Sequence, residues 1–264
     1  MKRIVLAATL GVMTSNAQAA EQQRWLNFVA CPVMRDTATV PCWLSEYKGE
    51  LYYLVLQQSA AAAVYPPYLG HQVLVEGVVS DEPRICGGLV LKPVKLSNLP
   101  ELDPSCNTIL PAEDRYQVKA PRGPGPSPPR GAGGPPPARP VAAPLTGRHT
   151  FSVSYEFDVD WANRSGRVIS EVVDYAKASK ASAVEIVAYR GATKLSAGGD
   201  YVERSDIAER RARRLQDTFA ELGVDPAVIK IVWRDKPSKT KGPEDYMNRR
   251  AEITVTPGIQ TAGR

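Results

Sequence analysis

The chain has 264 residues, 43% of them hydrophobic, and a formal net charge of +5 at pH 7. The hydrophobic content is ordinary for a globular protein, and the length is enough for two modest domains. The positive excess is mild, so it does not indicate nucleic-acid binding. It suits an environment of anionic cell-wall and outer-membrane polymers.

Residues 1–19 have the features of a secretory signal peptide. Lys2 and Arg3 precede an apolar run at 4–12 that is too short to span a bilayer, and AQA at 17–19 supplies small residues for cleavage. Polar residues at 14–16 interrupt the apolar stretch, which argues against an uncleaved anchor. We therefore expect export to the periplasm, on the outer-membrane or cell-wall side, with no transmembrane segment after cleavage.

All four cysteines lie in the first half of the chain, at Cys31, Cys42, Cys86 and Cys106. An even number of cysteines in an exported domain of roughly 95 residues predicts two disulfides. A metal site is the alternative, but the sequence has no CxxC pair. Three disulfide connectivities are open. The local one, Cys31–Cys42 with Cys86–Cys106, would close short loops, and the sequence does not select among the three.

Residues 20–118 have a β-rich pattern, which we interpret as a small closed or sandwich-like barrel. Strands are expected at 50–57 (ELYYLVLQ), 72–79 (QVLVEGVV) and 89–96 (LVLKPVKL). The stretch at 70–88, in which a strand bounded by glycine returns through a turn, is similar to an OB-type strand pair. His71 has no carboxylate or nucleophile at an informative spacing, so we expect a structural histidine.

Residues 119–146 consist almost entirely of Pro, Gly, Ala and Arg and cannot form a packed core. We predict a disordered linker with polyproline II character, about 3.1 Å long per residue, so that roughly 25 residues reach about 50–75 Å. Two interpretations stay open. The linker is either a spacer that lets two domains engage separate sites or an inert tether.

Residues 147–257 show alternating strand and helix patterns. The expected order is a strand at 150–158, a helix at 165–177, a strand at 183–189, a glycine-rich loop at 190–200, a helix at 205–224, and strands at 228–233 and 251–255. This β-α-β-α-β-β order predicts an α+β sandwich with its helices on one face of the sheet. Residues 258–264 are expected to be a disordered tail.

The helix at 205–224 has the clearest pattern in the chain. Its apolar residues recur at steps of three and four, at Ala208, Ala212, Leu215, Phe219 and Leu222. Ser205 or Asp206 is the expected N-cap, with Glu209 completing a capping box. Gly223 fits the left-handed residue that ends a helix, and Pro226 prevents continuation.

Arg211 lies beside the apolar stripe of this helix, whereas its neighbours Arg210, Arg213 and Arg214 point to water. A guanidinium at the edge of a core is a candidate clamp for an anion. The alternative is an arginine that packs its stem on the core and extends its charge to solvent. The helix pattern alone favours the second interpretation.

Three stretches resemble the OmpA-like C-terminal domain, a peptidoglycan-associating family. They are IAERRA at 207–212, LGV at 222–224 and MNRRAEI at 247–253, and their order and spacing agree with the family over residues 150–257. The resemblance implies an OmpA-like sandwich that binds the peptide stem of peptidoglycan without covalent chemistry. It implies that Arg211 receives a ligand carboxylate, for which a bidentate guanidinium is suited. Residues 20–118 resemble no family.

The chain departs from this family where a Thr-Asp pair would receive the ligand's ammonium. The corresponding residues are Ala188 to Gly191, and the loop behind them is longer. Asp200 is the nearest carboxylate that could substitute, Ser196 is another polar candidate, and Glu203 or Arg204 stands near a missing asparagine. Of the pair Arg249 and Arg250, we predict Arg250 as the site residue. The expected peptidoglycan site is thus Arg211, Asp200 and Arg250.

Two functions follow from these observations. The first is a non-enzymatic envelope protein that binds peptidoglycan through an altered form of the family site. The second uses the OmpA-like domain as a protein-interaction scaffold in an envelope assembly, without wall binding. We predict no cofactor, no metal and no catalytic residue, because no Ser/His/Asp set and no HExxH motif is present. The N-terminal domain is expected to contact envelope proteins.

Overall fold

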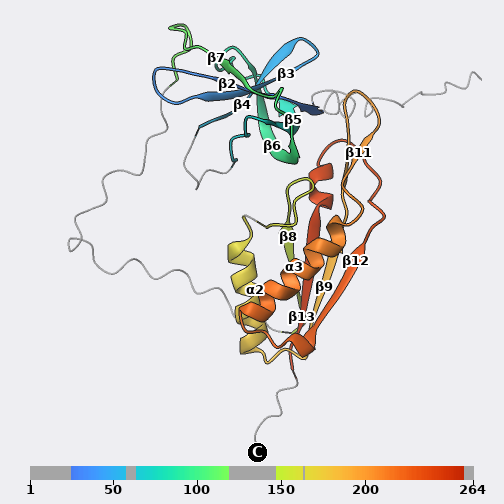
Figure 1. Ribbon diagram of the computed structural model, residues 1–264. Helices are drawn as coiled ribbons and strands as arrows, with labels where there is room; N and C mark the ends of the chain where they lie inside the picture. Colours follow the sequence, from blue (N-terminus) through green and yellow to red (C-terminus); the bar gives the residue numbers. More distant parts are fainter. Residues whose placement is uncertain (1–24, 58–63, 119–146, 163, 259–264) are drawn as a thin grey trace, which may run out of the picture.

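The structure, a computed structural model, describes residues 25–57, 64–118, 147–162 and 164–258. The predicted signal peptide, the linker at 119–146 and the tail after Gly258 lie outside these residues. We call the described part of 25–118 the N-terminal domain and that of 147–258 the C-terminal domain (Figure 1). No helix in these ranges is long and apolar enough to cross a membrane.

The N-terminal domain is one curled sheet of seven strands. They are β1 (Trp25–Ala30), β2 (Pro32–Arg35), β3 (Cys42–Tyr47), β4 (Glu50–Leu56), β5 (His71–Val79), β6 (Leu89–Leu102) and β7 (Thr108–Leu110). Their order in the sheet is β1-β5-β6-β4-β3-β2-β7. Side chains from five of the strands meet in one core, which includes Phe28, Trp43, Leu54, Val75 and Leu91.

The strands predicted at 50–57, 72–79 and 89–96 are present, and β6 runs further than expected, to Leu102. The OB-type strand pair is not confirmed. β5 and β6 are antiparallel neighbours within the seven-stranded order, while β4 pairs in parallel with β6 and β2 in parallel with β7. His71 has a structural role, since its Nδ1 lies 2.8 Å from the carbonyl oxygen of Leu99.

Both predicted disulfides form, but the local pairing is not the one adopted. Cys31 pairs with Cys106 and Cys42 pairs with Cys86, across 75 and 44 residues. The reason is the sheet order, because β7 lies beside β2 and brings Cys106 next to Cys31. All four thiols are consumed, so no thiolate is left for a metal.

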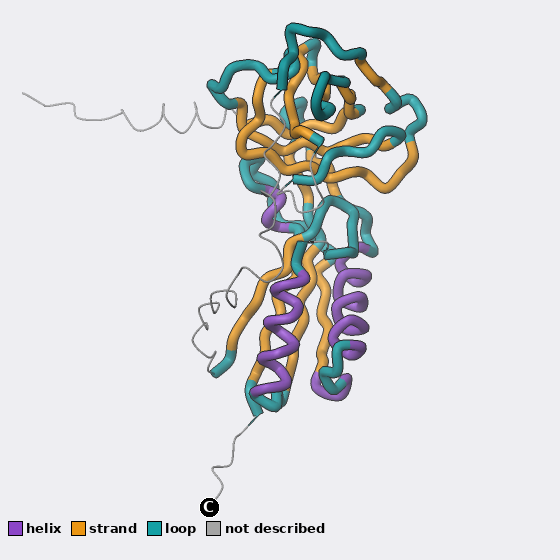
Figure 2. The backbone as a smooth tube through the Cα atoms, turned by 90° about the vertical axis from the view of Figure 1, so that its left-hand side faces the viewer, coloured by secondary structure: helices purple, strands orange, loops and turns teal. Residues whose placement is uncertain are grey.

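The C-terminal domain is a four-stranded sheet with two helices. Its elements are β8 (His149–Ser154), α2 (Gly166–Ala178), β9 (Ala183–Tyr189), β10 (Ala192–Lys194), β11 (Asp200–Val202), α3 (Ile207–Glu221), η1 (Pro226–Val228), β12 (Ile229–Arg234), η2 (Asp245–Asn248) and β13 (Arg250–Thr256). The sheet order is β12-β9-β13-β8. β9 and β13 alternate strictly between buried and half-exposed residues, so helices cover only one face (Figure 2).

The predicted β-α-β-α-β-β order is present with one addition. The glycine-rich loop contains a hairpin, β10 and β11, paired over three residues on each side. The first strand is shorter than expected and ends at Ser154, which pairs with Arg250, the first residue of β13. Polar residues on β10 and in the turn after it contact the N-terminal domain, so the hairpin extends the C-terminal domain toward it (Figure 1).

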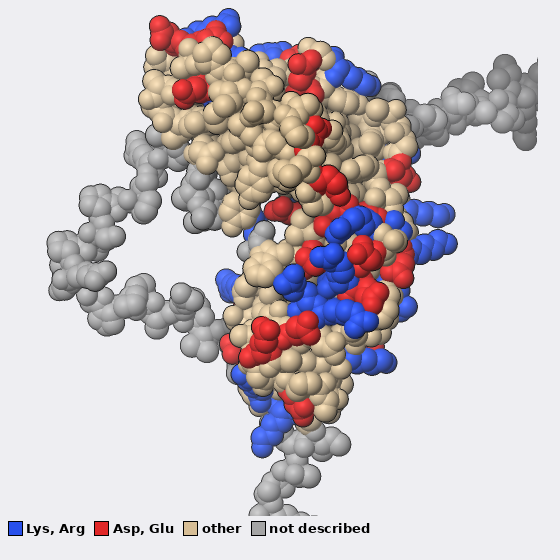
Figure 3. Space-filling model, viewed as in Figure 1, with Lys and Arg blue, Asp and Glu red and all other residues tan. Residues whose placement is uncertain are grey.

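α3 buries the predicted stripe except for Leu222, which is exposed beyond the helix end. Gly223 has a φ of +85° and ends the helix as expected. The capping box is not formed, since Asp206 stands at the N-cap position without a side-chain hydrogen bond to the helix. On the outer face of α3, Arg213 pairs with Glu209 and Arg210 pairs with Asp160. Figure 3 shows such charges interleaved over the visible face of the C-terminal domain.

Candidate functional site

Arg211 projects from the first half of α3 toward the sheet and is completely buried. Its guanidinium lies 4.6 Å from the ring centroid of Tyr155. All five N–H groups donate hydrogen bonds. Nε donates to the carbonyl of Val159, while the two terminal nitrogens donate to the carbonyls of Tyr189 and Glu156 and to the Glu203 carboxylate. No donor of this arginine is left for another group.

Glu203 supplies the anion of this site. It lies between β11 and α3, and its carboxylate meets Arg211 in a bidentate pair with N···O distances of 2.6 and 2.9 Å. The same two oxygens also accept the backbone N–H groups of Asp158 and Gly191. Both side chains of the pair are 0% exposed. Such a pair is tolerated inside a protein because every lone pair and every proton has a partner.

In this structure the anion paired with Arg211 is part of the chain itself, the carboxylate of Glu203. Glu203 takes up two of the Arg211 donors that were expected to hold the carboxylate of a ligand. The interpretation of Arg211 as an arginine reaching solvent is wrong, because its charged end is buried and neutralised. An external carboxylate could reach Arg211 only after Glu203 had left.

The structure does not bring the three predicted site residues together. Asp200 is exposed on β11, where it accepts a hydrogen bond from Thr240. Arg250 begins β13 on the sheet face without helices, and it pairs with Glu252 and stacks on Tyr189. Arg211 lies on the opposite, helix-covered face of that sheet. No contact joins Arg211 to Asp200 or Arg250 in the described part of the chain.

The neighbouring arginine, Arg249, is the buried member of its pair. It is 2% exposed, and its guanidinium forms a bidentate pair with Glu76 of the N-terminal domain. Thr193 on β10 completes this cluster, since it lies 2.9 Å from Arg249 Nη1 and donates a 2.8 Å hydrogen bond to Glu76. Three buried polar side chains thus join the two domains.

Further contacts extend this junction between the domains. Asn27 on β1 donates to the carbonyls of Lys194 and Gly242, and its backbone exchanges two hydrogen bonds with Ser196. An apolar cluster adjoins them, formed by Leu74, Leu99, Phe157, Val29, Leu195 and Tyr201. The described parts of the two domains therefore share a buried interface.

Gly191 connects the two buried ion pairs. A Cβ atom on this residue would lie 2.4 Å from Cγ of Arg249 and 3.1 Å from a carboxylate oxygen of Glu203. The backbone must therefore pass between the two side chains without a side chain of its own. The Arg211–Glu203 pair and the interdomain Arg249–Glu76 pair form one packed unit.

Asp158 lies beside this unit, where its backbone donates to Glu203 and its carboxylate accepts the N–H of Arg204. Burial raises the pKa of Asp158, the bond from Arg204 lowers it, and the negative charges of Glu203 and Glu101 raise it. A raised pKa means that its contribution to stability is present at low pH and is lost as the pH rises through the folded-state pKa.

We expect Asp158→Asn, which keeps the acceptor but cannot ionise, to have a higher urea midpoint than the wild type at pH 7. The two proteins should converge below about pH 4, where the wild-type carboxyl is also neutral. Urea midpoints at a series of pH values test this. An Asn variant that is less stable than the wild type at pH 7 would show that ionised Asp158 is favoured by its partners.

Sequence comparison gives no family: no family model matches the chain, and no curated protein matches it. Among solved structures, it is similar to the OmpA-like domain of FopA1 from Francisella tularensis subsp. tularensis SCHU S4, at 21% identity, a TM-score of 0.34, and coverage of 44% of this chain and 77% of that one.

Two further structures are similar to the same extent. The peptidoglycan-associated lipoprotein from Burkholderia pseudomallei has 21% identity and a TM-score of 0.31, with 40% of this chain and 89% of that one covered. The cell wall anchor of the T6SS from Pseudomonas aeruginosa has 15% identity and a TM-score of 0.34, with 43% and 85% covered.

Proposed function

We propose that this protein is a non-enzymatic component of the cell envelope, exported to the periplasm, whose OmpA-like domain is a scaffold for protein contacts. The observation that carries this proposal is the filled state of Arg211. Its five donors are bonded and Glu203 neutralises its charge, with both side chains 0% exposed. A ligand carboxylate would have to displace an intramolecular carboxylate that holds four hydrogen bonds.

The rigid connection between the domains also supports a scaffold. A domain that anchors a chain to a polymer can be joined to the rest of the chain by a flexible linker. A scaffold must instead hold its binding surfaces in a fixed orientation relative to each other. Here the Arg249–Glu76 pair and the bonds of Asn27 hold the two domains in one orientation. We propose the N-terminal domain as the surface that contacts envelope proteins.

Sedimentation with isolated sacculi tests this function. We expect the mature wild-type chain to stay in the supernatant at physiological salt, while a peptidoglycan-associated lipoprotein used as a positive control pellets. Saturable pelleting of the wild-type chain that a soluble stem peptide competes away would contradict the proposal. It would favour instead the wall-binding function, with Glu203 displaced from Arg211.

A cross-linking arm tests the scaffold directly. A photo-reactive residue in place of Leu102, which is 77% exposed on the N-terminal domain, should give discrete adducts with envelope proteins in cells. The same residue in place of Leu222, which is exposed at the end of α3, serves as the matched position on the other domain. Absence of protein adducts from both positions would count against a scaffold.

A further inference from the structure

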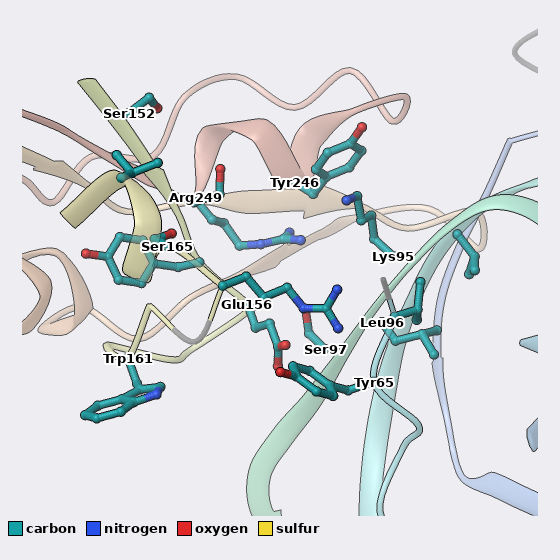
Figure 4. Close-up of a pocket in the computed structure, with 16 residues that line it drawn as sticks. Tyr65, Lys95, Leu96, Ser97, Ser152, Glu156, Trp161, Ser165, Tyr246 and Arg249 are labelled. Carbon is teal, nitrogen blue, oxygen red and sulfur yellow. The ribbon is translucent and has the colours of Figure 1, made fainter. Parts of the chain in front are cut away.

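A cavity of about 360 Å³ lies between the two domains, and neither Arg211 nor Glu203 lines it (Figure 4). Its volume is in the range of small-molecule sites. The N-terminal domain contributes Tyr65 and part of β6, and the C-terminal domain contributes β8, the segment leading to α2, and the residues before β13. Because both domains supply the walls, the cavity exists only while they are docked.

Arg164 is the first group that marks this cavity as a binding site. Its guanidinium stacks over the ring of Tyr65 at 4.1 Å from the centroid, and it has no hydrogen bond or ion pair among the described residues. Stacking fixes the plane of a guanidinium and leaves the N–H groups on its edge free. An arginine held in this way is prepared for a bidentate anion.

Two more features favour an anion beside Arg164. Lys95 of β6 lines the cavity, lies 5.4 Å from the ring centroid of Tyr246 and has no ion pair in the described ranges. α2 begins at the cavity, with Ser165 at its N-cap position. This serine makes no side-chain capping bond, and the first turn contains no acidic residue. The first N–H groups of a helix and its dipole attract negative charge.

The cavity also contains a carboxylate, that of Glu156, which has no hydrogen-bond donor among the described residues. Figure 4 shows Glu156, Lys95 and Arg249 around the same space. Burial raises the pKa of Glu156, and the charges of Arg164 and Arg249 lower it. A hydrogen-bond donor on a ligand would therefore stabilise the ionised carboxylate of Glu156.

Two buried polar atoms of the lining also lack partners. They are the hydroxyl of Tyr155 and Nε of Arg249, on residues that are 6% and 2% exposed. Buried polar groups without a partner are uncommon in native proteins, and each one needs a reason. Both residues line the cavity, and a group bound beside either atom would provide a partner.

We propose that this cavity binds a small organic acid whose anionic group is held by Arg164 and Lys95 at the start of α2, and whose donor group, an ammonium or a hydroxyl, is held by Glu156. Amino acids and hydroxy acids belong to this class. The site goes beyond the scaffold function, and it would couple occupancy of the cavity to docking of the domains, because the ligand contacts both.

Calorimetric titration of the mature full chain tests the proposal. The probes are L-alanine, L-glutamate, L-lactate and glucuronate, with alanine amide, which lacks the carboxylate, and acetate, which lacks the donor, as controls. We expect saturable binding of at least one probe, and at least tenfold weaker binding of both controls. If none of the four probes binds at concentrations up to about 10 mM, the proposal is overturned.

Variants locate the site. Arg164→Gln should weaken binding at least tenfold, whereas Arg167→Gln, three residues later and paired with exposed Glu171, should leave it unchanged. Glu156→Gln should reduce the preference for an amino acid over a hydroxy acid. Both arginines are exposed, so both variants are expected to fold. Equal binding by the two arginine variants would refute this site and would leave the filled state of Arg211 untouched.

Discussion

Glu203→Ala is expected to lower the free energy of unfolding by about 3–5 kcal/mol, the cost of breaking a buried ion pair on one side. The substitution leaves the guanidinium of Arg211 buried, charged and short of two hydrogen bonds. It also removes the acceptor of the backbone N–H groups of Asp158 and Gly191. Urea unfolding at pH 7 measures the loss.

The matched control for this experiment is Glu209→Ala, which removes a glutamate from the first turn of α3, six residues after Glu203. Glu209 pairs with Arg213 at the surface, so its loss should change the free energy by no more than about 0.5 kcal/mol. A loss at Glu203 as small as that at Glu209 would contradict the assignment of a buried, fully bonded pair.

A small carboxylate should partly rescue Glu203→Ala. Formate or acetate can occupy the space that the side chain leaves and restore an anion to Arg211. Stabilisation by a ligand at ten times its Kd amounts to about 1.4 kcal/mol. Chloride at equal ionic strength lacks the bidentate geometry and should not reproduce this gain. Equal effects of formate and chloride would show that the pocket does not select a carboxylate.

Arg249→Ala is expected to cost about 3–5 kcal/mol as well, because it leaves the carboxyl group of Glu76 buried at the interface without its ion-pair partner. The neighbouring Arg250→Ala is the control, since Arg250 is half-exposed and pairs with a half-exposed glutamate. The first variant should also separate the domains, which an increase of the radius of gyration in X-ray scattering would detect.

A double-mutant cycle assigns this loss to the pair. Glu76→Leu combined with Arg249→Met should be less destabilised than the sum of the single variants, because an apolar pair leaves no unpaired buried charge. Strict additivity, or an Arg249→Ala variant no less stable than Arg250→Ala, would contradict a direct role of the ion pair in domain docking.

Periodic patterns account for the parts of the fold that the sequence predicts correctly. The stripe of α3 follows from apolar residues at steps of three and four, and β9 follows from strict alternation in AVEIVAY. β1, β2 and β3 were not predicted, because each is a segment of six residues or fewer in which a polar residue, and in β2 also a proline, interrupts the apolar pattern. The β10–β11 hairpin pairs over only three residues, which is too short for a pattern.

The partners of the two buried arginines could not be predicted in the same way. Glu203 precedes Arg211 by eight residues and lies outside α3, so no helix spacing joins them. Glu76 is 173 residues away from Arg249. One sequence signal pointed to burial of Glu76. It shares a face of β5 with the apolar Leu74, and a face exposed to water should carry only polar residues. A strand apolar on both faces indicates that something covers it.

The sequence also could not show which arginine of the pair Arg249 and Arg250 is buried. The sequence places Arg249 and Arg250 side by side and does not say which one is inward. Strand alternation decides it in the structure, because Ala251 and Ile253 face the helices and Arg250 therefore faces away. Arg249 precedes the strand and reaches the other domain, a contact that no local pattern contains.

The most direct test of a self-occupied Arg211 is side-chain NMR of its guanidinium. With all five N–H groups bonded and buried, the Nε–H and Nη–H signals of Arg211 should exchange slowly with water. They should keep their chemical shifts when a soluble peptidoglycan stem peptide is added to millimolar concentration. Rapid exchange in the free protein, or a saturable shift of these signals with the peptide, would contradict the claim that Glu203 fills the site.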